Sequence, residues 1–196
     1  MTPQDEQQPF LYLVVCAAGV ASGVGELITA AHRRQWRVGV IATPPAVNGF
    51  FDVAAVEAQT GRPIRSAWRR PGDPRPFPDP DAVLVAPATF NTVNKWAAGV
   101  ADTLALGTLC EVVGLGVPVG VLPCVNETLA RHPAYRDSLT RLGAMGVRFA
   151  AAHDAAGGEG FGWERALDLL DRPGAVADPL GADRSGAGRS GAGGGR

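Results

Sequence analysis

The sequence lacks the features that nucleic-acid-binding and secreted proteins need. Its 196 residues include 18 basic and 19 acidic ones, a formal charge of −1, so it offers no broad positive surface to a nucleic acid or an anionic membrane. Its three cysteines are odd in number and widely scattered, which argues against a disulfide framework or a zinc site, and no metal is expected. This cysteine usage predicts a cytoplasmic protein, and the near-zero net charge predicts that its partner is a small molecule or another protein.

Long apolar runs and targeting signals are also missing. The first apolar run, Phe10–Ala18, is far shorter than the roughly 20 residues of a membrane span, and the polar segment before it has no basic start. Neither membrane insertion nor export is therefore expected. Hydrophobic residues still make up 46% of the chain, enough for a core. We expect one folded domain over residues 9–172 and a disordered Gly/Ala/Arg-rich tail at 173–196.

Strand-like and helix-like segments alternate along the chain. Short apolar runs predict strands at 10–16, 37–42, 82–86, 117–122 and 147–149. Apolar residues at helical spacing predict helices near 24–34, 53–58, 92–98, 102–113, 135–142 and 163–170. The proline-rich stretch from Pro63 to Pro80 predicts a long surface loop. This order predicts an α/β fold, a three-layer Rossmann-like open parallel sheet with helices on both faces.

A glycine-rich turn, Gly19–Gly25, joins the first predicted strand to the first helix. Exposed N–H groups at a helix start bind phosphate, so Gly19 and Ser22 are candidate ligands. A nicotinamide dehydrogenase is an alternative, but Thr43-Pro44-Pro45 stands where it needs an acidic residue, and Lys95 has no tyrosine four positions earlier. A P-loop is excluded because no Gly-Lys-Ser/Thr occurs. A second alternative is that the glycines only allow the strand and helix to pack closely.

The most specific segment runs from Ala86 to Leu104. It resembles the Pro-Ala-Ser-Ala-Asn-Thr…Lys…Gly-x-Ala-Asp-x-Leu signature of the homo-oligomeric flavin-containing cysteine decarboxylase family, which acts on phosphopantothenoylcysteine or on peptidyl cysteine. Thr89 and Phe90 replace the Ser and Ala of that signature. The positions that match are Pro87, Ala88, Asn91, Thr92, Lys95, Gly99, Ala101 and Asp102.

Two more stretches follow the same family in the same order. Ala18–Ser22 resembles its first flavin-phosphate turn, and Pro123–Asn126 with His132-Pro133 resembles its Pro-x-Met-Asn…Asn-Pro segment. The resemblance covers about residues 9 to 150. It implies bound FMN, placed between the subunits of a homotrimer or of a dodecamer built from trimers.

The residues support an FMN site independently of the resemblance. Hydroxyl and amide groups follow the 82–86 strand, and Thr43 follows the 37–42 strand. Because parallel strands end at one edge of the sheet, these groups should meet there and bind the ring and ribityl chain. The candidate cofactor-binding residues are Gly19, Ser22, Thr43, Thr89, Asn91 and Thr92. Thr89 and Asn91 can also cap the helix before Val93, and the two roles are compatible.

The catalytic residues of the family are only partly present. As the resemblance implies, the family oxidises the cysteine side chain to a thioaldehyde with FMN, loses carbon dioxide and uses a histidine as base. That histidine's position falls near Asp73, and none occurs between His32 and His132. Asp73 or Asp79 can substitute, although solvated loop carboxylates are the simpler interpretation. His132 is interpreted as a helix-start residue before Pro133.

Asn126 is the candidate catalytic residue that remains. Its amide N–H₂ can bind a substrate carboxylate, and an equally good interpretation is an N-cap for a helix starting at Glu127. Two functions therefore stay open. One is a divergent FMN-dependent decarboxylase of a small-molecule or peptide thiol, including a C-terminal peptide cysteine. The other is an FMN-binding redox or regulatory flavoprotein without decarboxylase activity.

Overall fold

Five short runs rich in Val, Leu and Ala form one parallel sheet, as the sequence predicts. The computed structural model describes residues 8–150 and 161–171, so the tail predicted at 173–196 lies outside the described residues. The strands are β1 (Phe10–Val15), β2 (Arg37–Ala42), β3 (Ala82–Ala88), β4 (Val119–Pro123) and β5 (Arg148–Phe149). Their order is β2-β1-β3-β4-β5, all parallel. The sheet therefore grows in opposite directions from β1, which creates a switch point between β1 and β3.

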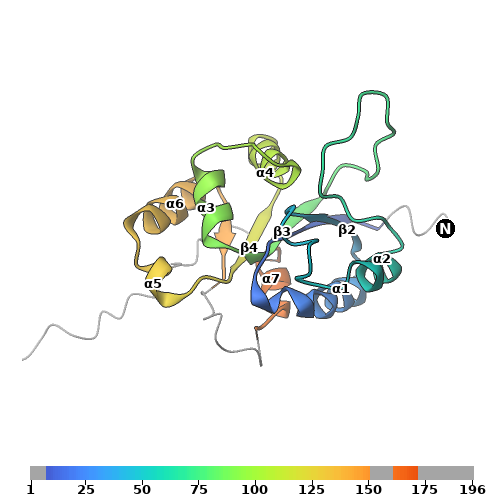
Figure 1. The fold of residues 1–196 in the computed structure, drawn as a ribbon, viewed down its shortest axis with the longest axis horizontal. Helices are drawn as coiled ribbons and strands as arrows, with labels where there is room; N and C mark the ends of the chain where they lie inside the picture. The colour runs from blue at the N-terminus through green and yellow to red at the C-terminus, as the bar shows by residue number, and fades with distance from the viewer. Residues whose placement is uncertain (1–7, 151–160, 172–196) are drawn as a thin grey trace, which may run out of the picture.

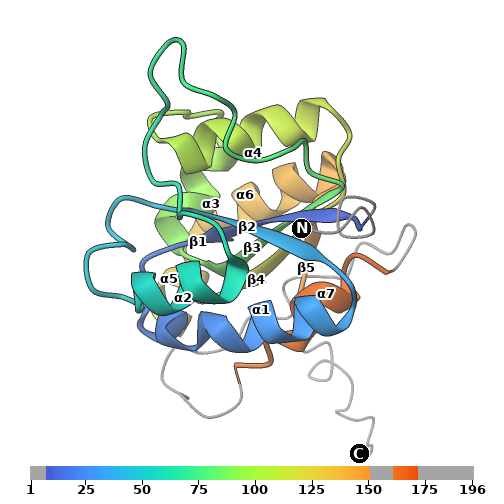
Figure 2. The ribbon, with the colours of Figure 1, turned by 90° about the vertical axis from the view of Figure 1, so that its right-hand side faces the viewer.

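Helices cover both faces of this sheet (Figures 1 and 2). One face packs against α1 (Val24–Arg33), α2 (Val53–Thr60) and α7 (Glu164–Asp168). The other packs against α3 (Phe90–Ala97), α4 (Leu104–Gly114) and α6 (Pro133–Ala144). A 3-10 helix (Gly19–Gly23) and α5 (Glu127–Ala130) complete the described elements. The predicted three-layer α/β architecture is confirmed, and none of the described helices is long and apolar enough to cross a membrane.

The strands alternate their side chains between the two layers. Leu11 and Leu13 of β1 point to the core with α1, while Phe10 and Val14 point to the core with α4 and α6. All four are buried, because a parallel sheet with helices on both faces leaves neither face to solvent. This two-sided burial explains why the strands appear in the sequence as continuous apolar runs.

The predicted loop over Pro63–Pro80 contains no helix or strand. It stands out from the body beside α4 in both ribbon views (Figures 1 and 2). The C-terminal end of the loop is anchored to β1. The ring centroid of the buried Phe77 lies 5.8 Å from that of Phe10, and the Tyr12 hydroxyl donates to the Pro78 carbonyl at 2.7 Å. The aromatic contacts hold the base of the loop against the sheet.

The same aromatic contacts make Gly39 in β2 sensitive to substitution. A Cβ at this position would lie 2.9 Å from the Phe10 ring and 3.0 Å from Phe77, both buried. We expect Gly39→Ala to lower the free energy of unfolding by about 1–3 kcal/mol, the usual cost of overpacking a core. Chemical denaturation measures the change, with Gly114→Ala as the control because a Cβ there meets nothing within 4 Å. Equal stability of the two variants would contradict this packing.

Candidate functional site

A cavity of about 610 Å³ lies where the first four strands end. Its lining includes Ala17–Gly19 after β1, Thr43–Pro45 after β2, Thr89–Thr92 after β3 and Cys124–Asn126 after β4. Open α/β sheets bind ligands at the carboxyl ends of their strands, at the switch point in strand order. The cavity has this position, and its volume is within the roughly 300–1,000 Å³ of small-molecule sites.

The cavity brings together most of the predicted site residues. Its lining includes Gly19, Thr43, Thr89, Asn91, Thr92 and Asn126. Ser22 differs, because it is exposed and does not line the cavity. The 3-10 helix adds a turn before α1 begins at Val24, so only its first residue, Gly19, reaches the site. The N-terminus that faces the cavity is that of the 3-10 helix, and Gly19 is the residue of the predicted Gly19–Ser22 turn that lines it.

Two threonines at the start of α3 line the cavity. Thr89 is the N-cap, its Oγ1 accepting from the Thr92 N–H at 3.4 Å, and the two hydroxyls lie 3.1 Å apart. Beneath them the Cys16 thiol is fully buried, which raises its pKa, while hydrogen bonds with Thr92 and Thr89 oppose the rise. Asn91 is exposed, and its side chain has no hydrogen bond within the described residues. The predicted capping role belongs to Thr89, whereas the Asn91 amide is available to a ligand.

Asn126 also fits both of its predicted roles. It is the N-cap of α5, with its Oδ1 accepting from the Leu129 N–H at 2.8 Å. This cap uses only the amide oxygen, so the N–H₂ group can still donate to a ligand in the cavity. His132 caps α6 through Nδ1, which accepts from the Ala134 N–H at 3.1 Å. His132 does not line the cavity, in agreement with its interpretation as a helix-start residue.

Three polar or reactive residues of this lining, Lys95, Thr103 and Cys124, are not among the predicted site residues. Cys124 is buried and directly follows β4, so the argument from strand ends that found Thr43 would have found it. Lys95 and Thr103 reach the cavity because α3 packs on α4, where the Trp96 indole N–H donates to the Leu109 carbonyl at 3.1 Å. Lys95 matches a position of the family signature, but the signature does not say where its side chain lies, and no pattern marks Thr103.

The loop carboxylates considered as replacement bases lie elsewhere. Asp79 lines a different cavity of about 600 Å³, between the proline-rich loop and α4, and pairs with Arg75 at 2.8 Å. Asp73 is exposed and accepts from the Arg70 N–H. Neither lines the strand-end cavity, whose described lining has no histidine or carboxylate. Within residues 8–150 and 161–171 no group of three or more His, Cys, Asp and Glu side chains is arranged to hold a metal.

Tyr135 of α6 lies behind the site and offers a test of its packing. Its ring stacks on Phe90 with centroids 5.8 Å apart, and its buried hydroxyl has no hydrogen-bond partner among the described residues. We expect Tyr135→Phe to leave the free energy of unfolding at neutral pH unchanged or to raise it by about 1 kcal/mol, since the lost hydroxyl made no bond. Denaturation at neutral pH measures this, and a clear loss of stability would contradict it.

The same variant should change the response to alkaline pH. Burial, followed by the nearby Cys124, raises the pKa of Tyr135 to about 12. An unfolded chain ionises its tyrosines near pH 10, so the unfolded state loses this proton first and stability falls as the pH rises from about 10 to 12. Tyr135→Phe should lack this part of the fall, which denaturation at several pH values measures.

The comparisons with known proteins agree on one family. A family model described as Flavoprotein matches residues 2–168. The coenzyme A biosynthesis bifunctional protein CoaBC of Thermococcus kodakarensis is 35% identical over 69 residues, 35% of this chain and 17% of that protein. CoaBC of Escherichia coli K12 is 27% identical over 173 residues, 83% of this chain and 39% of that protein. The chain thus spans less than two fifths of either relative.

Solved structures share the fold. The FMN-dependent cysteine decarboxylase TvaF from thioviridamide biosynthesis superimposes with a TM-score of 0.66 at 22% identity, covering 84% of this chain and 99% of that one. A mutant PPC decarboxylase gives 0.65 at 18% identity, covering 84% and 99%. At these identities the likeness establishes the α/β architecture.

Proposed function

This chain belongs to the Flavoprotein family, and on that premise we propose that it binds FMN in the strand-end cavity and decarboxylates a substrate with a cysteine thiol. The observation that carries the proposal is the grouping of Gly19, Thr43, Thr89, Asn91 and Asn126 in one cavity at the switch point. Two kinds of relative support it. CoaBC takes part in coenzyme A biosynthesis, and TvaF is an FMN-dependent cysteine decarboxylase.

The lining of the cavity fits FMN chemically. Hydroxyls of Thr43, Thr89 and Thr92 and the amide of Asn91 offer hydrogen bonds for a ribityl chain and for the polar edge of a flavin ring. The start of the 3-10 helix at Gly19 presents backbone N–H groups of the kind that bind phosphate. Apolar walls suit the flat ring, and they come from Pro44, Pro45, Phe90, Leu106, Val125 and Leu129.

The chain's own residues suit the binding of a carboxylate. FMN, when bound, supplies a two-electron oxidant for the carbon next to the substrate sulfur. The Asn126 N–H₂ can donate to the substrate carboxylate while its oxygen keeps α5 capped. Val125 is buried and Leu129 lines the same wall, so the carboxylate would lie beside apolar side chains.

One observation favours the second function, an FMN-binding redox or regulatory flavoprotein without decarboxylase activity. The described lining of the cavity has no histidine, aspartate or glutamate to act as base. Loss of a general base typically costs a factor of about 10²–10⁴ in rate. The two functions share the FMN site and differ only in turnover.

We also propose that the protein acts as a homotrimer or as a dodecamer built from trimers. Its substrate is a small-molecule or peptide thiol, and it binds neither nucleic acid nor a membrane. Light scattering of the FMN-bound protein measures the mass of the assembly. A monomer that binds FMN tightly would contradict this part of the proposal.

Mass spectrometry separates the two functions. The purified protein is incubated with a cysteine-ended peptide and, separately, with phosphopantothenoylcysteine. A product lighter by carbon dioxide, with or without two hydrogens, supports the decarboxylase. Bound FMN with no mass change for either substrate favours the redox or regulatory flavoprotein. A peptide whose terminal cysteine is replaced by serine is the matched control, since it lacks the thiol.

A further inference from the structure

Lys95 is the only lysine of the chain and the only charged residue in the described lining of the strand-end cavity. It lies in the last turn of α3, and the cavity extends along this helix to Thr103 and Leu106 at the start of α4. The neighbouring Trp96 is buried between α3 and α4, which fixes the rotation of the helix that places Lys95 on the cavity side. A single positive charge therefore borders an otherwise uncharged binding site.

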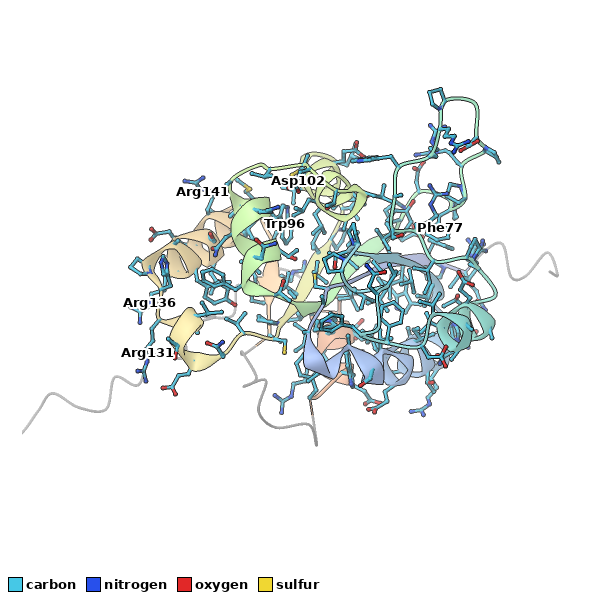
Figure 3. The ribbon with its side chains drawn as sticks, viewed as in Figure 1. Phe77, Trp96, Asp102, Arg131, Arg136 and Arg141 are labelled. Atoms are coloured by element: carbon cyan, nitrogen blue, oxygen red, sulfur yellow. The ribbon has the colours of Figure 1, made fainter. Side chains whose placement is uncertain are left out.

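Asp102 positions this charge from outside the cavity. Asp102 lies in the turn between α3 and α4 (Figure 3). Its Oδ2 is 2.5 Å from the Lys95 Nζ, and Asp102 is not part of the cavity lining. An ammonium has three N–H donors, so this ion pair leaves two of them for another acceptor. Both side chains are more than a third exposed, and ion pairs of this kind add little to stability.

A purely structural role for Lys95 at the end of α3 is already filled by another residue. Cations near a helix C-terminus stabilise its last carbonyl groups. Arg141 of α6, labelled in Figure 3, donates from Nη1 to the Ala97 carbonyl at 3.2 Å. Arg141 does not line the cavity. The α3 terminus thus has a cation of its own, and the position of Lys95 at the cavity needs a different explanation.

We propose that Lys95 binds an anionic group of the ligand in this cavity, and that Asp102 is the positioning residue that holds the ammonium in place. The inference rests on the proposed function, since the two anionic groups that function brings are the phosphate of FMN and the carboxylate of the substrate. Both are oxyanions that an ammonium binds through charge-assisted hydrogen bonds.

The experiment compares ligands that differ only in the anionic group. Binding of FMN and of riboflavin, which lacks the phosphate, is measured by quenching of flavin fluorescence in the wild type and in Lys95→Met. Binding of a cysteine-ended peptide and of its C-terminal amide to the FMN-loaded proteins is measured by calorimetry. Lys95→Arg keeps the positive charge, and Asp102→Asn removes the ion pair while leaving the ammonium.

We expect Lys95→Met to lower the affinity for one of the anionic ligands by about tenfold or more, the usual effect of losing a hydrogen bond to a charged group. The affinity for the neutral counterpart of that ligand should not change. If the affinity falls for FMN and not for riboflavin, Lys95 binds the FMN phosphate. If it falls for the peptide acid and not for the peptide amide, Lys95 binds the substrate carboxylate. Lys95→Arg should recover most of the affinity, and Asp102→Asn should lose less than Lys95→Met.

Because Lys95 is the only lysine, amine acylation gives a readout that does not depend on activity. Apart from the N-terminal amine, Lys95 is the only primary amine that an acylating reagent can modify, and peptide mass spectrometry gives its rate. The anionic ligand that Lys95 binds should slow this reaction, and its neutral counterpart should not.

The outcomes separate this inference from the function on which it rests. A wild type that binds FMN, with affinities in Lys95→Met within twofold of the wild type or lowered equally for charged and neutral ligands, contradicts the role of Lys95 alone. A wild type that binds neither flavin contradicts the proposed function, and the inference falls with it.

Discussion

Replacing Asn126 with aspartate is expected to lower kcat/KM for decarboxylation by about 10²-fold or more without destabilising the protein. The Asn126 oxygen caps α5 by accepting from the Leu129 N–H at 2.8 Å, and an aspartate oxygen accepts the same bond. The aspartate cannot donate, however, and it places a negative charge where we propose that the substrate carboxylate binds. The lost charge-assisted hydrogen bond and the repulsion together account for the factor.

This substitution separates the two roles of Asn126, which Asn126→Ala cannot do. Alanine removes the cap and the donor together, so its effect mixes stability with binding. Kinetics and thermal unfolding of all three proteins make the comparison. An aspartate variant with wild-type kcat/KM would show that Asn126 is only a helix cap, and the carboxylate would then have to bind elsewhere in the cavity.

The second large effect is expected at Gly19, the residue where the 3-10 helix meets the cavity. Gly19→Glu should weaken FMN binding by about 10²-fold or more, because a carboxylate beside the phosphate costs several kcal/mol at about 4 Å. The fold should tolerate the change, since a Cβ at Gly19 meets no atom within 4 Å. Fluorescence titration measures the affinity, and thermal unfolding checks the fold.

The control for this prediction is Gly19→Gln, which has the same shape without the charge. If the phosphate binds at this turn, the glutamine variant should bind FMN better than the glutamate variant, while riboflavin should distinguish the two far less. Equal loss of FMN in both variants would show that the effect is steric. Unchanged FMN binding in Gly19→Glu would contradict a phosphate site at the start of the 3-10 helix.

Much of the fold was predictable because its signals are local. The bounds of β2, Arg37–Ala42, are those that the sequence predicts, since a short apolar run between an arginine and a threonine has few other interpretations. Asn126 and His132 cap α5 and α6 as expected, because capping depends on residues two or three positions away. The helix predicted near 92–98 begins two residues earlier, at Phe90, because Thr89 and not Asn91 is its cap.

The site was less predictable, because its walls meet through packing between distant segments. The strand-end rule located Thr43 and Thr89, whose places depend only on where strands stop. Gly19 came from the glycine-rich turn, and Asn126 from the resemblance to the family's Pro-x-Met-Asn segment. Ser22 was placed in the site because the glycine-rich turn gave no sign of a separate 3-10 helix, which carries Ser22 away from the cavity. Lys95 matched the family signature but was given no role in the site, since its place at the cavity depends on how α3 packs against α4.

The visible absorption spectrum of the purified protein, titrated with FMN, tests the central claim most directly. The account predicts a protein that is yellow as purified or that becomes saturated with added FMN, with one FMN per chain. It also predicts that the Gly19→Glu variant binds far less FMN. A colourless wild type that shows no affinity for added FMN would contradict the claim that the strand-end cavity is a flavin site.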